Sequence, residues 1–197
     1  MTLPLRYFVL HKPYGMVSQF VSSNSTSLLG GIPFNFPEGT HAIGRLDKNS
    51  EGLLLLTTDK KITALLFQGK IPHKRTYLVQ ANYEVGSEKI LRLRKGVDIR
   101  IDKGLMYRTP PCDARIAAAP EQLAPLPFPF YMDLPTTWLE LTLEEGRYHQ
   151  VRKMVTAIGH RTLRLIRTSI EDLELNGLPS GCVKEMDRDN FYALLKL

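Results

Sequence analysis

The sequence has few of the residues that build metal centres and disulfide frameworks. Its two cysteines, Cys112 and Cys182, lie far apart in the chain. They therefore offer neither the Cys-x-x-Cys spacing of a zinc site nor the several pairs of a disulfide-rich domain. The five histidines are not spaced as metal ligands either. We expect no bound metal.

Nucleotide-binding motifs and membrane-crossing segments are also missing. The sequence contains no P-loop, no Gly-x-Gly-x-x-Gly fingerprint and no His-Glu-x-x-His motif, so nucleotide-driven, dinucleotide and zinc chemistry lack their usual support. Residues 1–15 lack the long apolar run of a signal peptide, and no stretch is long enough to span a bilayer. We expect a cytoplasmic protein with no membrane attachment.

The overall composition is that of a globular protein with a moderate positive charge. Of the 197 residues, 43% are hydrophobic and 23% are charged, which allows a sizeable core in one large domain or two closely joined lobes. The net charge of +6 favours an anionic partner.

Local patterns predict a mixture of strands and helices. Strands are indicated at 6–13, 52–58, 74–81, 97–101, 112–117, 136–146 and 160–170. Helices are indicated at 59–70, 87–96, 147–159 and 186–197. Asp59 and Ser87 are the predicted N-caps of the first two helices, residues 18–40 form a long loop, and the proline-rich segment 119–136 is a candidate hinge. Since strands and helices do not alternate strictly, we expect an α+β fold.

Positive charge is concentrated in two windows without acidic residues, 60–83 and 146–170. Clustered charge of one sign is typical of phosphate binding, although a solvated helix face or strand edge would give the same pattern. Several tyrosines could stack on unpaired bases or could simply pack in the core: Tyr14, Tyr77, Tyr107 and Tyr148.

One aspartate stands out at a bend before a strongly apolar segment. The stretch GRLDKNSEGLLLLTTD, residues 44–59, places Arg45 and Asp47 just before four leucines. A solvated ion pair on a surface turn is one interpretation. The other is a carboxylate fixed at the mouth of a cleft and kept ionised by an arginine, ready for nucleophilic or base chemistry.

Four segments together resemble the successive motifs of a known enzyme family. HKPYGMVSQ, GRLDKNSEGLLLLTTD, HKRTYLV and EEGRYHQVRKMVTAIGHRTLRLIRTSI are similar, in the same order, to motifs of the pseudouridine synthases of the RsuA/RluB/RluE/RluF branch. The family usually has Thr at the position of Ser50 and often Gly at that of Lys60. Ser50 keeps the hydroxyl, and Lys60 would begin a helix, so both departures are compatible with the pattern.

The resemblance implies a fold and an activity. It implies a central mixed, mostly antiparallel sheet flanked by helices, with an active-site cleft between two lobes. The first catalytic-domain strand begins within a few residues of Met1, so we expect a single catalytic domain over 1–197 without the S4-like RNA-binding domain of many relatives. The implied activity is isomerisation of a flipped-out uridine in ribosomal RNA, of the large-subunit type, with no cofactor. We expect a monomer with no obligate protein partner.

The resemblance also implies site residues. The family's catalytic aspartate matches Asp47, its strand tyrosine matches Tyr77, and its basic active-site residue matches Arg152. The aspartate could add to the base, add to the sugar carbon or remove a proton, and these routes stay open. Candidate RNA contacts are polar side chains in or beside the motifs: Lys12, Arg45, Lys74, Arg75, Arg147, His149, Gln150, Lys153, Arg164 and Arg167.

Helical spacing separates the neighbours Arg152 and Lys153. Each helical residue advances about 100°, and the apolar stripe is Val151, Met154, Val155 and Ile158. Arg152 then lies at the edge of the stripe and Lys153 on the far side. We predict that Arg152 pairs with Asp47, whereas Lys153 at most contacts RNA.

Two other functions stay open on sequence grounds. A non-catalytic RNA-binding or ribosome-assembly protein could use the same fold, although the retained Asp47 argues against it. A glycosidase-like hydrolase usually needs two carboxylates, and nothing in the sequence places Glu51 in the cleft beside Asp47.

Overall fold

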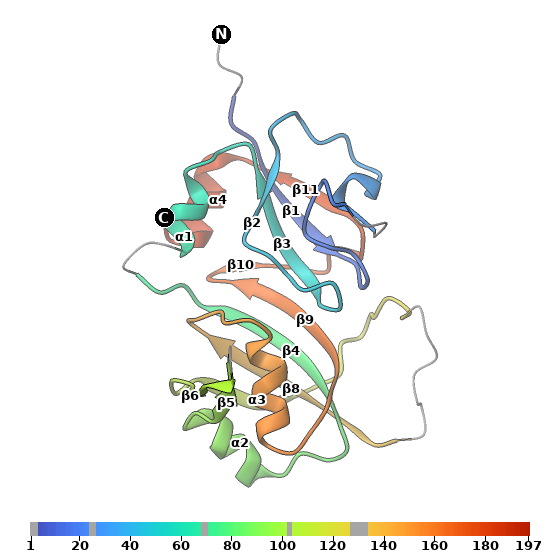
Figure 1. Cartoon of the computed structure of the whole chain (residues 1–197). Coiled ribbons are helices and arrows are strands. Elements are labelled where there is room, and N and C mark those ends of the chain that lie inside the picture. Colours follow the sequence, from blue (N-terminus) through green and yellow to red (C-terminus); the bar gives the residue numbers. More distant parts are fainter. Residues whose placement is uncertain (1–3, 24–26, 68–70, 102–103, 127–133) are drawn as a thin grey trace. The chain divides into compact units, whose positions relative to one another are not determined.

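The computed structural model describes residues 4–23, 27–67, 71–101, 104–126 and 134–197 (Figure 1). The chain forms two compact units, the first from residues 1–73 and 167–197 and the second from residues 74–166. The chain crosses after His73 and returns after Ile166, inside β9 (Thr162–Ile170). The proline-rich segment 119–136 lies within the second unit, with 127–133 outside the described residues, and its role as a hinge stays a prediction.

The first unit is organised around β3 (Glu51–Thr57), which carries the four leucines. β3 pairs antiparallel with β1 (Tyr7–Lys12), and β1 pairs antiparallel with β11 (Val183–Met186) (Figure 1). β2 (His41–Ile43) also pairs with β3, and β10 (Leu173–Glu174) pairs with the end of β9.

Both faces of β3 are covered, which explains its continuous apolar run. Leu53 and Leu55 pack in a cluster with α1 (Ile62–Phe67) and α4 (Arg188–Leu195), whereas Leu54 and Leu56 pack in a second cluster with the 3-10 turn η1 (Leu29–Gly31). All four leucine side chains are fully buried. The strand therefore gives a rigid base to the turn that precedes it.

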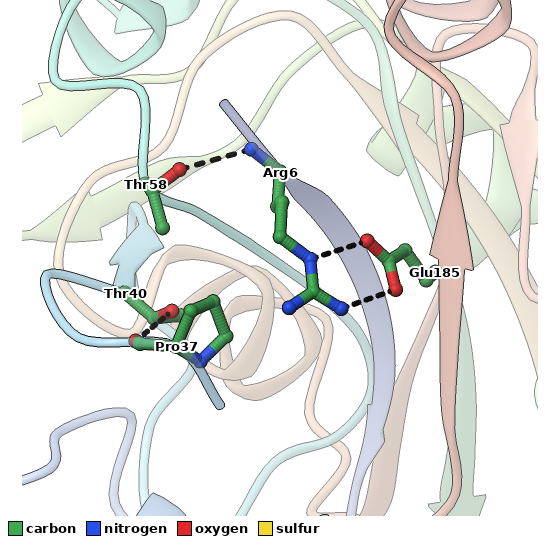
Figure 2. A network of polar contacts seen from close by, with 5 residues as sticks. All are labelled: Arg6, Pro37, Thr40, Thr58 and Glu185. Carbon is green, nitrogen blue, oxygen red and sulfur yellow. Dashed lines mark hydrogen bonds and ion pairs between the residues drawn. The ribbon is translucent and has the colours of Figure 1, made fainter. Parts of the chain in front are cut away.

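Polar contacts fasten the outer strands of the first unit. Figure 2 shows the guanidinium of Arg6 donating to both carboxylate oxygens of Glu185, each at 2.6 Å, next to the β1–β11 pairing. The Arg6 N–H donates to the Thr58 hydroxyl at 2.9 Å, and the Thr40 hydroxyl donates to the Pro37 carbonyl at 2.7 Å (Figure 2). The Arg6, Thr58 and Thr40 contacts all lie at the end of the β1–β3 pair where Tyr7 pairs with Thr57.

The second unit is built on an antiparallel group of three strands. β4 (Arg75–Asn82) pairs with β8 (Thr136–Leu143), and β8 pairs with β7 (Asp113–Ala117). Alternate residues of β4 are buried, among them Tyr77, Val79 and Ala81. Against this group pack α2 (Ser87–Arg94) and α3 (Gln150–Ala157), and a ribbon of β5 (Asp98–Arg100) and β6 (Met106–Arg108) completes the unit.

The α+β class is confirmed, and most of the long predicted elements are present. The cap assigned to Ser87 is wrong: Gly86 is the N-cap, without a side-chain hydrogen bond, and Ser87 is the first helical residue. The short strands β2, β6, β10 and β11 were not predicted. Within the described residues, no helix has the length and apolarity needed to cross a bilayer.

Candidate active site

Asp47 lies on the turn between β2 and β3, and the residue before it is fixed on both sides. The Leu46 side chain is 7% exposed. The buried hydroxyl of Ser18 donates to the Leu46 carbonyl at 2.9 Å and accepts from the Leu46 N–H at 3.0 Å. A single serine thus satisfies both main-chain groups of the residue that leads into the aspartate.

The residues after Asp47 are fixed as well. The Asp47 carbonyl accepts the Ser50 N–H at 3.0 Å, which closes the turn, and the Lys48 carbonyl accepts the Gly15 N–H at 2.8 Å. Gly15 has φ +80°, a conformation that glycine adopts without strain. The half-buried Asp47 side chain is therefore held on a rigid main chain.

Lys12, at the end of β1, ties this turn to the preceding segment. Its side chain is fully buried. Its ammonium donates to the carbonyls of Pro13 at 2.8 Å, Met16 at 2.6 Å and Lys48 at 3.5 Å. With the ammonium buried among main-chain carbonyls, the structure does not support the RNA contact predicted for Lys12 and gives it a positioning role.

Charged side chains surround Lys12 in the first unit. The pKa of Lys12 is lowered to about 8, mainly by burial; Glu51 and Asp47 oppose this shift, and Arg167 adds to it. Glu51 and Arg167 are 1% and 3% exposed, and the Arg167 Nε donates to the Leu53 carbonyl at 2.8 Å. The region therefore combines two carboxylates with two cations in little water, where charges interact strongly.

Tyr77 and Arg152 belong to the second unit. Tyr77, on β4, is 9% exposed and packs in the same cluster as Val151 and Met154 of α3. The apolar stripe predicted for this helix is buried, and the half-buried Arg152 lies at its edge. Asp47 belongs to the first unit, and its ion pair with Arg152 stays a prediction.

The segment before α3 is braced by its own side chains. The Arg147 guanidinium lies 3.8 Å from the centre of the Tyr107 ring, and the Tyr107 hydroxyl donates to Glu145 at 2.7 Å. The Gln150 side chain, 3% exposed, accepts from the Arg147 N–H at 2.9 Å and donates to Glu145. Gln150 thus closes the turn internally, and the structure does not support the RNA contact predicted for it.

The other predicted RNA contacts differ in exposure. Arg45, Lys74 and Arg147 are exposed, and His149 and Lys153 are half-buried. Arg75 and Arg164 are buried, and their guanidinium groups donate to the carbonyls of Glu144 at 3.5 Å and Ala124 at 2.9 Å. The exposed side chains are the ones available to a large ligand.

Sequence reasoning missed Ser18 and Gly15 as anchors of the Asp47 turn. Both lie in the quoted segment HKPYGMVSQ, but nothing in the local pattern indicates that this segment contacts residues 46–48. Within the described ranges, no group of three His, Cys, Asp or Glu side chains is arranged to hold a metal ion. What the turn presents is a half-buried carboxylate beside buried cations.

Comparison with known proteins identifies relatives over most of the chain. The sequence model of the family described as RNA pseudouridylate synthase matches residues 6–157. Ribosomal large subunit pseudouridine synthase E of Vibrio parahaemolyticus is 38% identical over 184 residues, 92% of this chain and 74% of that protein. The protein of the same name from Xanthomonas axonopodis pv. citri is 37% identical over 172 residues, 86% of this chain and 88% of that protein. A crystal structure of a pseudouridylate synthase matches with a TM-score of 0.76 and 27% identity, covering 97% of this chain and 74% of that one.

Proposed function

The chain belongs to the RNA pseudouridylate synthase family, and we propose that it converts a uridine of ribosomal RNA to pseudouridine with Asp47 as the catalytic carboxylate. The names of the relatives support ribosomal RNA, of the large subunit, as the substrate. We also propose a cytoplasmic location, since an enzyme of this kind works where ribosomal RNA is made and assembled. We propose a monomer with a single catalytic domain.

The reaction is an isomerisation whose atoms balance without a second substrate. The bond between uracil N1 and the ribose C1′ breaks, and a bond between C5 and C1′ forms. C5 loses a proton and N1 gains one. A carboxylate can assist by adding to the base, by adding to C1′ or by taking the C5 proton. Because these atoms are unreachable in a stacked helix, the nucleotide has to be unpaired or flipped out.

The observation that carries this proposal is the way in which the Asp47 turn is held. Ser18, Gly15 and Lys12 bind the main chain on both sides of Asp47. A catalytic group gains from such support because it does not have to be ordered during the reaction. A solvated surface turn would not need a buried lysine under it.

We assign the remaining side chains by type and exposure. Tyr77 is proposed to contact the target base and Arg152 to pair with Asp47. Exposed or half-buried cations are proposed to bind phosphates: Arg45, Lys74, Arg147 and Lys153.

The test is incubation of the protein with a large-subunit ribosomal RNA transcript labelled in its uridines. The proposal predicts isomerised base in the digested RNA. Unchanged base would indicate a binding protein, and released uracil would indicate a glycosidase-like hydrolase. Mapping pseudouridines in ribosomal RNA from cells with and without the gene then identifies the target.

The variant Asp47→Asn tests the catalytic assignment. It keeps the shape of the side chain and removes its ionisable oxygen, so turnover should fall by about 10²–10⁴-fold or more while the protein stays folded. Asp172→Asn is the matched control in the same unit, because Asp172 is an exposed carboxylate paired with Lys196. Substantial turnover by Asp47→Asn would remove Asp47 from the reaction.

A further inference from the structure

Two aromatic rings are stacked on the turn just before α3. The rings of Tyr148 and His149 have centroids 3.9 Å apart and planes inclined by 19°. Tyr148 is nevertheless 68% exposed. His149 therefore covers one face of a tyrosine ring whose residue is otherwise largely open to solvent.

The backbone under this pair is held in an uncommon conformation. His149 has φ 54° and ψ 26°, in the left-handed region that non-glycine residues rarely adopt. It is the N-cap of α3, yet its side chain makes no capping hydrogen bond. The hydrogen bond by which a polar N-cap side chain usually stabilises a helix is therefore absent. The contact that accompanies this uncommon backbone conformation is the stacking of the two rings.

The stack stands on a braced turn. The Gln150 side chain binds the Arg147 N–H and Glu145, and the Gln150 N–H donates to the Arg147 carbonyl at 3.0 Å. The Lys153 N–H donates to the His149 carbonyl at 3.0 Å. An exposed ring on a turn fixed from both sides loses little conformational entropy when a ligand covers it.

The charges beside the stack indicate the chemistry of that ligand. The Lys153 ammonium lies over the Tyr148 ring, 5.4 Å from its centre, and the Arg147 side chain is 44% exposed and lies 3.8 Å from a carboxylate oxygen of Glu145. A flat apolar face bordered by cations fits an unpaired nucleobase with its phosphates. An apolar protein surface covering this face would desolvate both cations without adding an anion for them.

We propose that Tyr148, backed by His149, is a stacking platform for an unpaired base of the RNA, with Arg147 and Lys153 beside it for the adjoining phosphates. The base is not the target uridine, which the proposed function assigns to Tyr77. This inference rests on the proposed function in one respect only, the identification of the ligand as ribosomal RNA. Stacking of this kind tolerates any base. It therefore adds affinity for unpaired RNA and contributes little to sequence specificity.

The test uses a single-stranded oligoribonucleotide that contains 2-aminopurine, whose fluorescence falls when it stacks on an aromatic ring. Binding of the full-length protein should quench the probe. Tyr148→Ala should lose the quenching and weaken binding by about 5- to 100-fold, whereas Tyr148→Phe should keep both. A fully paired duplex of the same sequence should bind wild type and Tyr148→Ala equally.

Two further variants separate stacking from backbone effects. Asn favours the left-handed conformation, so His149→Asn keeps the turn, removes the backing ring and should lose part of the quenching. Tyr83 is 49% exposed, also has a positive φ of 62° and precedes an acidic residue, Glu84. Tyr83→Ala should change neither quenching nor affinity.

The outcomes are distinguishable from those of the activity assay. If Tyr148→Ala binds and quenches like wild type, the platform is refuted whether or not pseudouridine forms. If no pseudouridine forms but the quenching depends on Tyr148, the proposed reaction fails and the platform stands. Equal weakening of duplex and single-strand binding by Tyr148→Ala would also refute the platform, because a duplex offers no free base.

Discussion

The two regions that carry the proposed function use charge in opposite ways. Around the Asp47 turn in the first unit, Lys12, Glu51 and Arg167 are at most 3% exposed. On the segment before α3 in the second unit, Arg147 is 44% exposed at its side chain and Tyr148 is 68% exposed. The buried cations Lys12 and Arg167 donate to main-chain carbonyls and fix geometry, whereas the exposed Arg147 is proposed to bind RNA.

A third cluster shows that exposed arginines need not face a ligand. A pocket of the second unit is lined by Arg92, Lys95 and Arg108. The Arg92 guanidinium donates to the Ala157 carbonyl at 3.1 Å at the end of α3, and that of Arg108 reaches the Lys95 carbonyl at 3.5 Å at the end of α2. Cations at these positions neutralise helix C-termini, so we do not assign this pocket to RNA.

After the loss of Asp47 itself, the largest expected effect separates the neighbours Arg152 and Lys153. If Arg152 pairs with Asp47, Arg152→Ala leaves a poorly solvated carboxylate without its partner, which costs about 3 kcal/mol, or about a hundredfold in turnover at saturating RNA. Lys153→Ala should mainly raise the RNA concentration at half-maximal rate. Initial rates over a range of RNA concentrations measure both, and exchanged phenotypes would overturn the assignment.

The next effect concerns stability. Lys12→Met keeps the length of the side chain and leaves the carbonyls of Pro13 and Met16 without their buried donor. We expect the free energy of unfolding to fall by about 2–4 kcal/mol in urea denaturation. Lys48→Met is the control, since Lys48 is an exposed lysine of the same turn. Equal stability of the two variants would show that Lys12 does not support the turn.

The change of unfolding free energy with pH is expected to be smaller, and it measures the burial of the Lys12 ammonium independently. The pKa of Lys12 is about 8 in the folded protein, against its ordinary value of 10.5. Between these values the unfolded chain holds a proton that the folded chain has released, so this residue makes stability rise with pH. The difference in unfolding free energy between wild type and Lys12→Met should widen by roughly 2 kcal/mol from about pH 7.5 to about pH 9.5. A constant difference would contradict the lowered pKa.

The contrast between buried and exposed charge also marks the limit of sequence reasoning. The periodicity of α3 was sufficient to predict its buried stripe, and the four leucines were sufficient to predict β3, because both signals are local. β11 was missed because its pairing with β1 joins residues at opposite ends of the chain. Gly86 was missed as a cap because Ser87 is the more usual residue for that role.

At the site, burial separates residues that the sequence pattern had grouped together as RNA contacts. Lys12 and Gln150 lie in the quoted motifs, yet both are buried and bind other parts of the protein. A lysine whose ammonium contacts carbonyls of the chain has the same local pattern as one that contacts phosphate. Only the fold, which brings Lys12 to the Lys48 carbonyl, distinguishes the two.

The smallest expected effect compares one arginine from the segment before α3 with one from the third cluster. A side chain that binds a phosphate displaces a counterion, so losing it flattens the salt dependence of binding. Arg147→Ala should reduce the slope of log affinity against log salt by about one. Arg92→Ala should leave the slope unchanged, because its guanidinium is used by the Ala157 carbonyl.

Tyr148→Ala should weaken binding without changing the slope, since a stacked ring releases no ions. Filter binding of one single-stranded RNA at several salt concentrations measures all three. Equal slopes for Arg147→Ala and Arg92→Ala would mean that a contact with a main-chain carbonyl does not distinguish structural arginines from RNA-binding ones in this protein.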